Sequence, residues 1–222
     1  MSVFSKICGL STPETLDAAL KGGASHVGFV FFTKSPRNLT PDRAAGLAAK
    51  AGNNVKIVGL FVNPTPEDID RVRAQVRLDV IQLHGDEHPA LVSQIAMTNG
   101  LEVWKAVPVR TAADLKIASK YRGAANLILY DAKPPVGSDL PGGNGLRFDW
   151  ELLRGHAHPL PWALSGGLDA GNLAEAVRIT NASLVDVSSG VESAPGVKDQ
   201  EKLKRFVVRL HEAATTESGN LD

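Results

Sequence analysis

Four side chains able to exchange protons stand at the ends of short apolar runs: Cys8, His84, Asp131 and Asp186. A cysteine can act as nucleophile or base, and histidine and aspartate can act as general acid or base. Each also has an ordinary structural alternative: a small buried thiol, a core histidine bonded to backbone, or an aspartate in a turn. Their recurrence at the ends of separate apolar runs favours one shared functional site.

Two glycine-bearing turns point to a bound phosphate. Ser165-Gly166-Gly167-Leu168 and Ser188-Ser189-Gly190-Val191 each follow an apolar run late in the sequence. Backbone N–H groups in such turns can surround phosphate oxygens, and glycine permits the close approach that a Cβ would block. One such turn is weak evidence because turns often need glycine, but two successive ones predict phosphate binding at Gly166, Gly167, Ser189 and Gly190.

The elements that must position these groups alternate along the whole chain. Short β-branched runs are followed by amphipathic helical stretches, which is typical of parallel strands joined by crossover helices. The expected strands cover residues 3–9, 26–32, 56–62, 79–84, 102–109, 126–131, 162–165 and 184–188. Eight such units predict a single-domain (β/α)₈ TIM barrel of the α/β class, whose active site lies at the carboxyl ends of the strands.

Helix boundaries support the eight units. Thr12, Thr40 and Thr65 each precede a proline and an acid, a typical helix start, and Gly22-Gly23 and Asn99-Gly100 follow helix ends. The last helix is expected at about residues 199–214, so residues 1–214 form the barrel and 215–222 a frayed tail. A doubly wound sheet is the alternative, but Cys8-Gly9-Leu10 does not fit a dinucleotide-binding loop.

Strand alternation places the candidate groups on common faces. Lys6 and Cys8 share one face of the first strand, and Gln82 and His84 share one face of the fourth. Asp131 is in phase with two leucines, and Asp186 with Ser188. Residues 134–145, which contain two prolines in succession and four glycines, predict a mobile lid after the sixth strand.

Composition excludes several other classes of protein. Among 222 residues, 24 Lys and Arg balance 24 Asp and Glu, which gives no indication of nucleic-acid or membrane-surface binding. No apolar run approaches the ~20 residues of a membrane span, and the first residues do not resemble a signal peptide. A single cysteine cannot form an internal disulfide, which favours a reducing, cytoplasmic location.

The residues also resemble a known family, the phosphoribosylanthranilate isomerases. The matching segments occur in order from Lys6 to Asp199, although Asn144 stands where the family usually has threonine. They are Lys6-Ile7-Cys8-Gly9, Gly28-Phe29-Val30-Phe31, Ser35-Pro36-Arg37, Gly59-Leu60-Phe61-Val62-Asn63, Gln82-Leu83-His84-Gly85, Phe148-Asp149-Trp150, Leu164-Ser165-Gly166-Gly167-Leu168, Asp186-Val187-Ser188-Ser189-Gly190-Val191-Glu192, Pro195-Gly196 and Lys198-Asp199.

The resemblance implies an Amadori rearrangement in tryptophan biosynthesis, in which a phosphorylated aminosugar becomes an aminoketose. It implies that Asp131 is the general acid that opens the sugar ring and that Cys8 is the base that removes the C2′ proton. Arg37 would bind the anthranilate carboxylate and Asp186 would position the ribose or amine. His84 lies in a family motif without a fixed role. No metal or organic cofactor is expected, because the protonated imine is itself the electron sink.

These roles make opposite physical demands. A general acid must keep its proton near neutral pH, whereas a free aspartate, with a pKa of about 3.9, has lost it. Asp131 therefore needs desolvation or a nearby anion such as the substrate's phosphate or carboxylate. A base needs the thiolate form, and we expect Lys6, on the same strand face, to favour it for Cys8.

Rival interpretations remain on the same barrel. An aminoimidazole-carboxamide ribotide isomerase would favour an aspartate in place of Cys8, with a second glycine loop half-way, where Val62-Asn63-Pro64-Thr65 stands. An indole-glycerol-phosphate synthase would need several strand-end lysines, of which Lys105 is a partial match. A non-catalytic phosphate-binding barrel would bind ligand without turnover. The protein is expected to be a monomer or homodimer.

Overall fold

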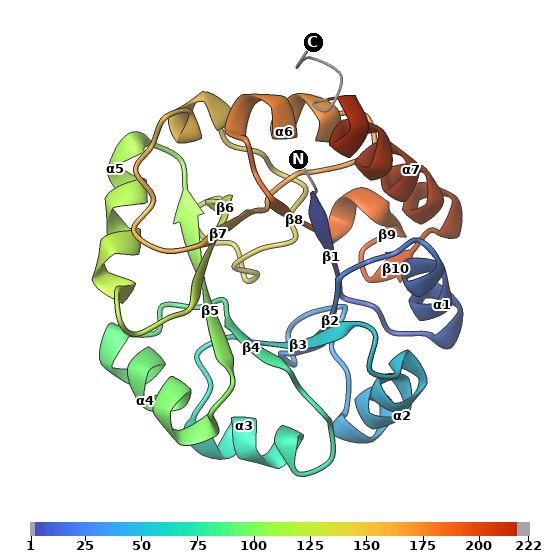
Figure 1. Cartoon of the computed structure of the whole chain (residues 1–222). Coiled ribbons are helices and arrows are strands. Elements are labelled where there is room, and N and C mark those ends of the chain that lie inside the picture. Colours follow the sequence, from blue (N-terminus) through green and yellow to red (C-terminus); the bar gives the residue numbers. More distant parts are fainter. Residues whose placement is uncertain (1–2, 217–222) are drawn as a thin grey trace.

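The computed structural model describes residues 3–216 as a closed barrel of eight parallel strands. Viewed along its axis, the strands form an inner ring and the helices an outer one (Figure 1). The strands pair in sequence order, and β1 pairs with β8 to close the ring. They are β1 (Phe4–Cys8), β2 (His26–Phe31), β3 (Lys56–Phe61), β4 (Val80–Leu83), β5 (Glu102–Val109), β6 (Leu127–Ala132), β7 (Trp162–Leu164) and β8 (Leu184–Val187).

This topology confirms the predicted barrel and excludes the doubly wound sheet. Each strand lies within the predicted range or one residue beyond it, and β5 has the predicted bounds. The outer ring consists of α1 (Pro13–Lys21), α2 (Pro41–Ala51), α3 (Pro66–Arg73), α4 (Pro89–Asn99), α5 (Ala112–Leu115), the 3₁₀ helices η1 (Lys116–Tyr121) and η2 (Trp150–Leu153), α6 (Leu173–Thr180) and α7 (Gln200–Thr216).

Two units depart from the simple repeat. The segment after β6 contains η2, a single 3₁₀ turn, in place of a full α-helix. After β8 the chain forms the 3₁₀ turn η3 (Ser189–Val191) and a small antiparallel hairpin, β9 (Glu192–Ala194) and β10 (Val197–Lys198), before α7. Residues 215 and 216, the first two of the predicted frayed tail, are the last two residues of α7. The rest of the predicted tail, residues 217–222, lies outside the described part of the chain.

The helix starts form as the sequence predicts. Thr12, Thr40 and Thr65 are the N-caps of α1, α2 and α3, and each hydroxyl accepts a backbone N–H three residues later. Thr65 also completes a capping box with Asp68. Gly100 ends α4 in the left-handed conformation, at φ 64°. These local signals fix where each helix begins and so where the preceding loop must run.

The barrel is filled in layers, so polar groups near its mouth rest on an apolar floor. Strand residues that face the helices form the largest cluster, with Ile7 and Phe29 among its buried members. Residues that face inward form a layer inside the barrel, composed of Val58, Val80, Trp104, Ala106, Leu129, Ala163 and Leu184. A smaller set, Cys8, Val30 and Leu60, packs together at the rim of the site. Within residues 3–216, no helix has the length and apolar character needed to span a bilayer.

Candidate active site

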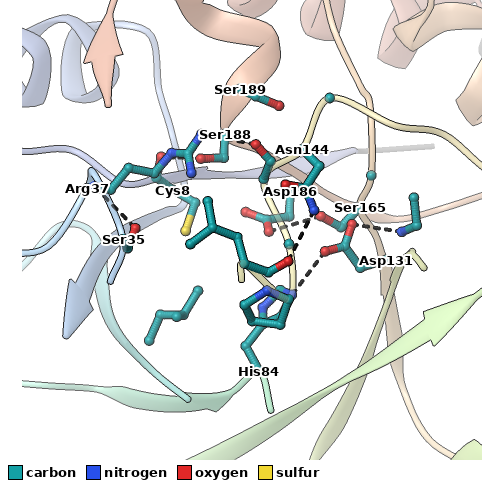
Figure 2. A pocket seen from close by; sticks show the side chains of 18 of the residues that line it. Cys8, Ser35, Arg37, His84, Asp131, Asn144, Ser165, Asp186, Ser188 and Ser189 are labelled. Carbon is teal, nitrogen blue, oxygen red and sulfur yellow. Dashed lines mark hydrogen bonds and ion pairs between the residues drawn. The ribbon is translucent and has the colours of Figure 1, made fainter. Parts of the chain in front are cut away.

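One cavity lies at the carboxyl ends of the strands and collects most of the predicted site residues. Its unfilled space is about 740 Å³, including the part open to solvent. Figure 2 shows Cys8 and Asp131 on either side of it. Of the predicted residues, it is lined by Cys8, Arg37, His84, Asp131, Gly166, Gly167, Asp186 and Ser189, whereas Gly190 is not part of the lining.

Cys8 lies beside a buried ion pair. Lys6 Nζ donates a hydrogen bond of 2.8 Å to Asp186 Oδ1 across the β1–β8 seam, and both side chains are almost fully buried. A Cβ on Gly28 would lie 3.0 Å from Cys8 Sγ and 3.1 Å from Lys6 Cε, so the thiol and the ammonium stem are neighbours. Burial alone would lower the pKa of Lys6, but Asp186 and Cys8 outweigh it and raise that pKa. The arrangement supplies a permanent positive charge beside the thiol.

Asp131 ends β6 with both carboxylate oxygens occupied. Oδ1 accepts the backbone N–H of Ala132 at 2.8 Å, and Oδ2 lies 3.0 Å from His84 Nε2. His84 Nδ1 in turn lies 2.9 Å from the amide Nε2 of Gln82, which is fully buried inside the barrel. The role of His84, left open by the sequence, is therefore a direct contact with the predicted acid.

Arg37 is held rigidly by an acid from the β9–β10 hairpin. Its Nε and Nη2 each donate at 2.8 Å to the two oxygens of Glu192, and Nη2 also donates to the carbonyl of Gly143 at 3.1 Å. Lys198 Nζ contacts Glu192 Oε1 at 2.7 Å. Since Glu192 uses one full edge of the guanidinium, only the edge formed by Nη1 and Nη2 faces the cavity.

The pKa shifts of Arg37, Glu192 and Lys198 indicate the charges of this buried cluster. Burial raises the pKa of Glu192, but hydrogen bonds from Arg37 and the charge of Lys198 outweigh it, so the pKa is lowered overall. Burial lowers the pKa of Arg37, yet Glu192 more than compensates and raises it. Lys198 differs, because burial lowers its pKa more than Glu192 raises it. Arg37 therefore stays cationic and fixed at the rim of the cavity.

The two glycine turns lie side by side at the mouth. Gly166 and Gly167 have φ of 88° and 64°, conformations that side-chain-bearing residues rarely adopt. A Cβ on Gly190 would lie 1.9 Å from the carbonyl oxygen of Leu168, so this glycine lets the turn after β8 pack against the turn after β7. Ser189 reaches the cavity, whereas Gly190 supports the packing of the two turns.

The segment predicted as a lid lies over the mouth. A Cβ on Gly142 would be 2.6 Å from both Asp131 Oδ2 and His84 Nε2, and one on Gly143 would be 2.6 Å from Arg37 Nη1. Asn144, where threonine was expected, bonds through Nδ2 to the carbonyl of Leu140 at 3.2 Å within the same segment. The lid glycines therefore pack directly on three of the predicted site residues.

Several functional contacts had no assigned role in the sequence interpretation. Ser165 donates to Asp186 Oδ2 at 3.2 Å, so Asp186 is oriented from two strands. Gln82, Glu192 and Lys198 were noted only as members of motifs or faces. Alternation along β4 was the available signal for Gln82, since it places that residue with His84. Nothing local in the sequence pairs Glu192 with Arg37, because 155 positions separate them.

The chain was compared with known proteins. The family model described as N-(5′-phosphoribosyl)anthranilate (PRA) isomerase matches residues 5–209. The N-(5′-phosphoribosyl)anthranilate isomerase of Paramagnetospirillum magneticum is 52% identical over 207 residues, which cover 93% of this chain and 96% of that protein.

Solved structures agree with the sequence match. Monomers of the dimeric phosphoribosylanthranilate isomerase of Thermotoga maritima superpose with a TM-score of 0.81 at 36% identity, covering 95% of this chain and 99% of theirs. A phosphoribosylanthranilate isomerase in complex with reduced 1-(o-carboxyphenylamino)-1-deoxyribulose 5-phosphate has a TM-score of 0.82 and 36% identity, with the same coverage.

Proposed function

The chain belongs to the N-(5′-phosphoribosyl)anthranilate isomerase family, and from this membership we infer how its cavity works. The protein is an isomerase of tryptophan biosynthesis. It converts N-(5-phospho-β-D-ribosyl)anthranilate to 1-(2-carboxyphenylamino)-1-deoxy-D-ribulose 5-phosphate by an Amadori rearrangement. Family membership sets aside the other two sugar-phosphate enzymes considered from the sequence.

Asp131 and Cys8 divide the proton transfers between them. Asp131 gives its proton to the ring oxygen, the C1′–O bond breaks, and the nitrogen lone pair forms a protonated imine. Cys8, as thiolate, removes the C2′ proton and the electron pair moves into the imine, giving an enolamine. Ketonisation moves one proton onto C1′ and releases one from the C2′ hydroxyl, so no net proton, oxidant or reductant is consumed. One observation carries this proposal: a thiol from β1 and a carboxylate from β6 face the same cavity.

The remaining groups bind the two ends of the substrate. The guanidinium of Arg37 suits the anthranilate carboxylate through Nη1, because Nη2 donates to Glu192 and to the carbonyl of Gly143. The turns containing Gly166, Gly167, Ser189 and Gly190 suit the phosphate. Asp186, held by Lys6 and Ser165, lies between these ends, where the ribose would lie.

The lid must move for this reaction to occur. Gly142 lies against Asp131 and His84 and Gly143 against Arg37, without room for even a Cβ between them, so a substrate group on this side of these residues needs the segment to move. A substrate carboxylate at Arg37 competes with the Gly143 carbonyl for Nη2. Binding is therefore coupled to a displacement of this segment, which then excludes water from the imine.

The proposal is tested by anthranilate fluorescence during turnover. Freshly made phosphoribosylanthranilate is followed with wild type, Cys8→Ala and Asp131→Asn, against spontaneous hydrolysis. Fast conversion by wild type with background decay in both variants is expected. Wild-type rates in either variant would overturn the role of that residue. Binding of substrate by wild type without turnover would instead indicate a non-catalytic barrel.

The molecular setting follows from the same roles. A single thiol used as a base must stay reduced, which suits the cytoplasm, and the partner is a small phosphorylated aminosugar. Residues 1–214 act as one domain, as a monomer or homodimer. Light scattering of the purified protein distinguishes these two states, and limited proteolysis that cuts only beyond residue 214 would support the single domain.

A further inference from the structure

A chain of two hydrogen bonds leads from the barrel interior to the general acid. Gln82 Nε2 contacts His84 Nδ1 at 2.9 Å, and His84 Nε2 contacts Asp131 Oδ2 at 3.0 Å. Gln82 is fully buried, and the side chains of His84 and Asp131 are 9% and 7% exposed. Gln82 of β4 and His84, which directly follows the strand, are in phase with Val80 of the inward-facing layer, as the alternation of the strand requires.

The cost of burying Gln82 suggests a role other than stability. Within the described chain its Oε1 has no hydrogen-bond partner, so a polar atom is buried without compensation. An apolar side chain would fill this position in the barrel interior at lower free energy. What the amide contributes is the single contact to His84 Nδ1.

Donor and acceptor rules then fix the state of His84. The amide NH₂ of Gln82 faces Nδ1, and because an NH₂ group only donates, this orientation of the amide pairs with an Nδ1 that accepts and carries no proton. In a neutral imidazole the proton is then on Nε2, which faces Asp131 Oδ2. We propose that Gln82 and His84 are positioning residues that keep an Nε2–H donor on Asp131 throughout the reaction.

The proposal deepens the proposed function and rests on Asp131 being the general acid. While Asp131 is protonated, an Nε2–H group on Oδ2 cannot accept that proton, so His84 does not compete for it with the ring oxygen of the substrate. Once the proton has been delivered, the same N–H stabilises the carboxylate that remains. With the opposite tautomer, Nε2 would accept the proton of Asp131 and withdraw it from the substrate.

The surroundings leave this role to His84. Other charged groups of the cavity that holds Asp131 are Cys8, Arg37 and Asp186, and the last two are paired with Glu192 and Lys6. A second cavity, which shares His84 and Asp131, adds charged groups from three loops: Lys34, Asp86 and Asp139. Gly142 of the lid lies against both partners of the His84–Asp131 bond.

The tautomer can be measured without any turnover. Long-range ¹H–¹⁵N correlation spectra of labelled wild-type protein distinguish a protonated Nε2 from a protonated Nδ1 in each of the six histidines. The spectrum of His84→Gln assigns the signal of His84. A neutral imidazole with Nε2–H is expected between pH 7 and 8, and an Nδ1–H imidazole would overturn the proposal.

Kinetics then test the consequence for the acid. In Gln82→Glu, a carboxylate accepts from Nδ1 and the imidazole becomes protonated on both nitrogens. An imidazolium beside Asp131 favours its ionised form. The alkaline limb of the kcat profile should move by one pH unit or more to lower pH, and kcat at pH 8 should fall at least tenfold, with KM changed less than twofold. An unshifted profile in a folded Gln82→Glu protein would refute the proposed positioning role of Gln82 and His84.

Matched variants separate this proposal from the assignment of Asp131. His84→Gln retains an N–H donor and should keep kcat within about fivefold, whereas His84→Leu should lose fiftyfold or more. Equal losses in the two variants would refute the donor role. Wild-type activity of Asp131→Asn would refute the assignment of Asp131 as the general acid. An inactive Asp131→Asn together with a normal Gln82→Glu would refute only the positioning role of Gln82 and His84.

Discussion

Glu192→Gln tests whether the hairpin after β8 holds the substrate-binding arginine. The carboxylate contacts both Arg37 and Lys198, and all three side chains are at least 94% buried. Removing one partner of a buried ion pair costs about 3–5 kcal/mol, because a buried charge loses its counterion. Gln keeps one acceptor oxygen, and Lys198, whose pKa burial already lowers, can release its proton. We therefore expect a loss of about 2–4 kcal/mol in the free energy of unfolding.

This loss is large enough to measure in two ways. For a protein of this size, 1 kcal/mol shifts Tm by about 2–4 °C, so thermal unfolding followed by circular dichroism should show a decrease of roughly 5–15 °C. Arg37 would also lose the contact that orients its free edge, so KM should rise about tenfold, the equivalent of about 1.4 kcal/mol, with a smaller change in kcat.

Lys198→Met is the matched control. It leaves the pair between Arg37 and Glu192 intact and removes the excess positive charge together with the Lys198 hydrogen bonds to Ser188, so its cost should be smaller than that of Glu192→Gln. The double variant should lose less than the sum of the singles, because the two residues contact each other. A Glu192→Gln protein with Tm and KM within error of wild type would refute the reasoning.

The pH dependence of the Tm difference between wild type and Glu192→Gln follows from the direction in which the pKa of Glu192 is shifted. The pKa of Glu192 is lowered in the folded protein. Its contribution to stability is therefore fully present above the unfolded value of about 4.3 and is lost as the pH falls through the lower folded pKa. The Tm difference between wild type and Glu192→Gln should be constant from pH 6 to 8 and shrink below about pH 4.

Four further substitutions have expected outcomes. Gly190→Ala introduces a Cβ 1.9 Å from a carbonyl oxygen and should cost about 3 kcal/mol or more in urea unfolding, whereas Gly46→Ala, in α2 with open space around it, should gain up to about 1 kcal/mol. Asn181→Gly, at a φ of 56° after α6, should stabilise the protein by up to about 1 kcal/mol in the same assay, and a loss would show that the asparagine side chain contributes there. Lys6→Met removes the cation beside Cys8, so alkylation of this thiol should require higher pH, and an unchanged alkylation profile would contradict the expected influence of Lys6.

Local features of the fold were predictable because they depend on neighbours in sequence. Strand positions follow from apolar alternation, and the starts of three helices follow from a threonine before a proline. The segment after β6 was harder. Its 3₁₀ turn η2 replaces a full α-helix, and although Asp149 caps it, so short an element has no periodic stretch that distinguishes it in the sequence.

The site was predictable in its membership more than in its contacts. Alternation and strand ends predicted which side chains reach the mouth, including Cys8, His84 and Asp131. The partners of these groups depend on the closed ring. The bond from His84 to Asp131 joins residues 47 positions apart, and the two parallel bonds from Arg37 to Glu192 join residues 155 apart.

The seam of the barrel runs through its active site. β1 pairs with β8, and Lys6 of the first strand bonds Asp186 of the last at 2.8 Å. Ser188 likewise donates to the carbonyl of Cys8 at 3.3 Å. Contacts between the two ends of a chain form only when both ends exist. A nascent chain that lacks β8 therefore already contains Cys8 and Lys6 but not Asp186, the residue that pairs with Lys6.

Because of this arrangement, the active site forms only in a chain that includes β8. A product truncated before residue 184 would retain seven strands, but Lys6 would be left without its counterion inside an open ring. Such a fragment should be both inactive and unstable, and so exposed to proteolysis. Conversely, the adjacency of β1 and β8 suits circular permutation, in which the original ends are joined and new ends are opened in a loop between two other strands.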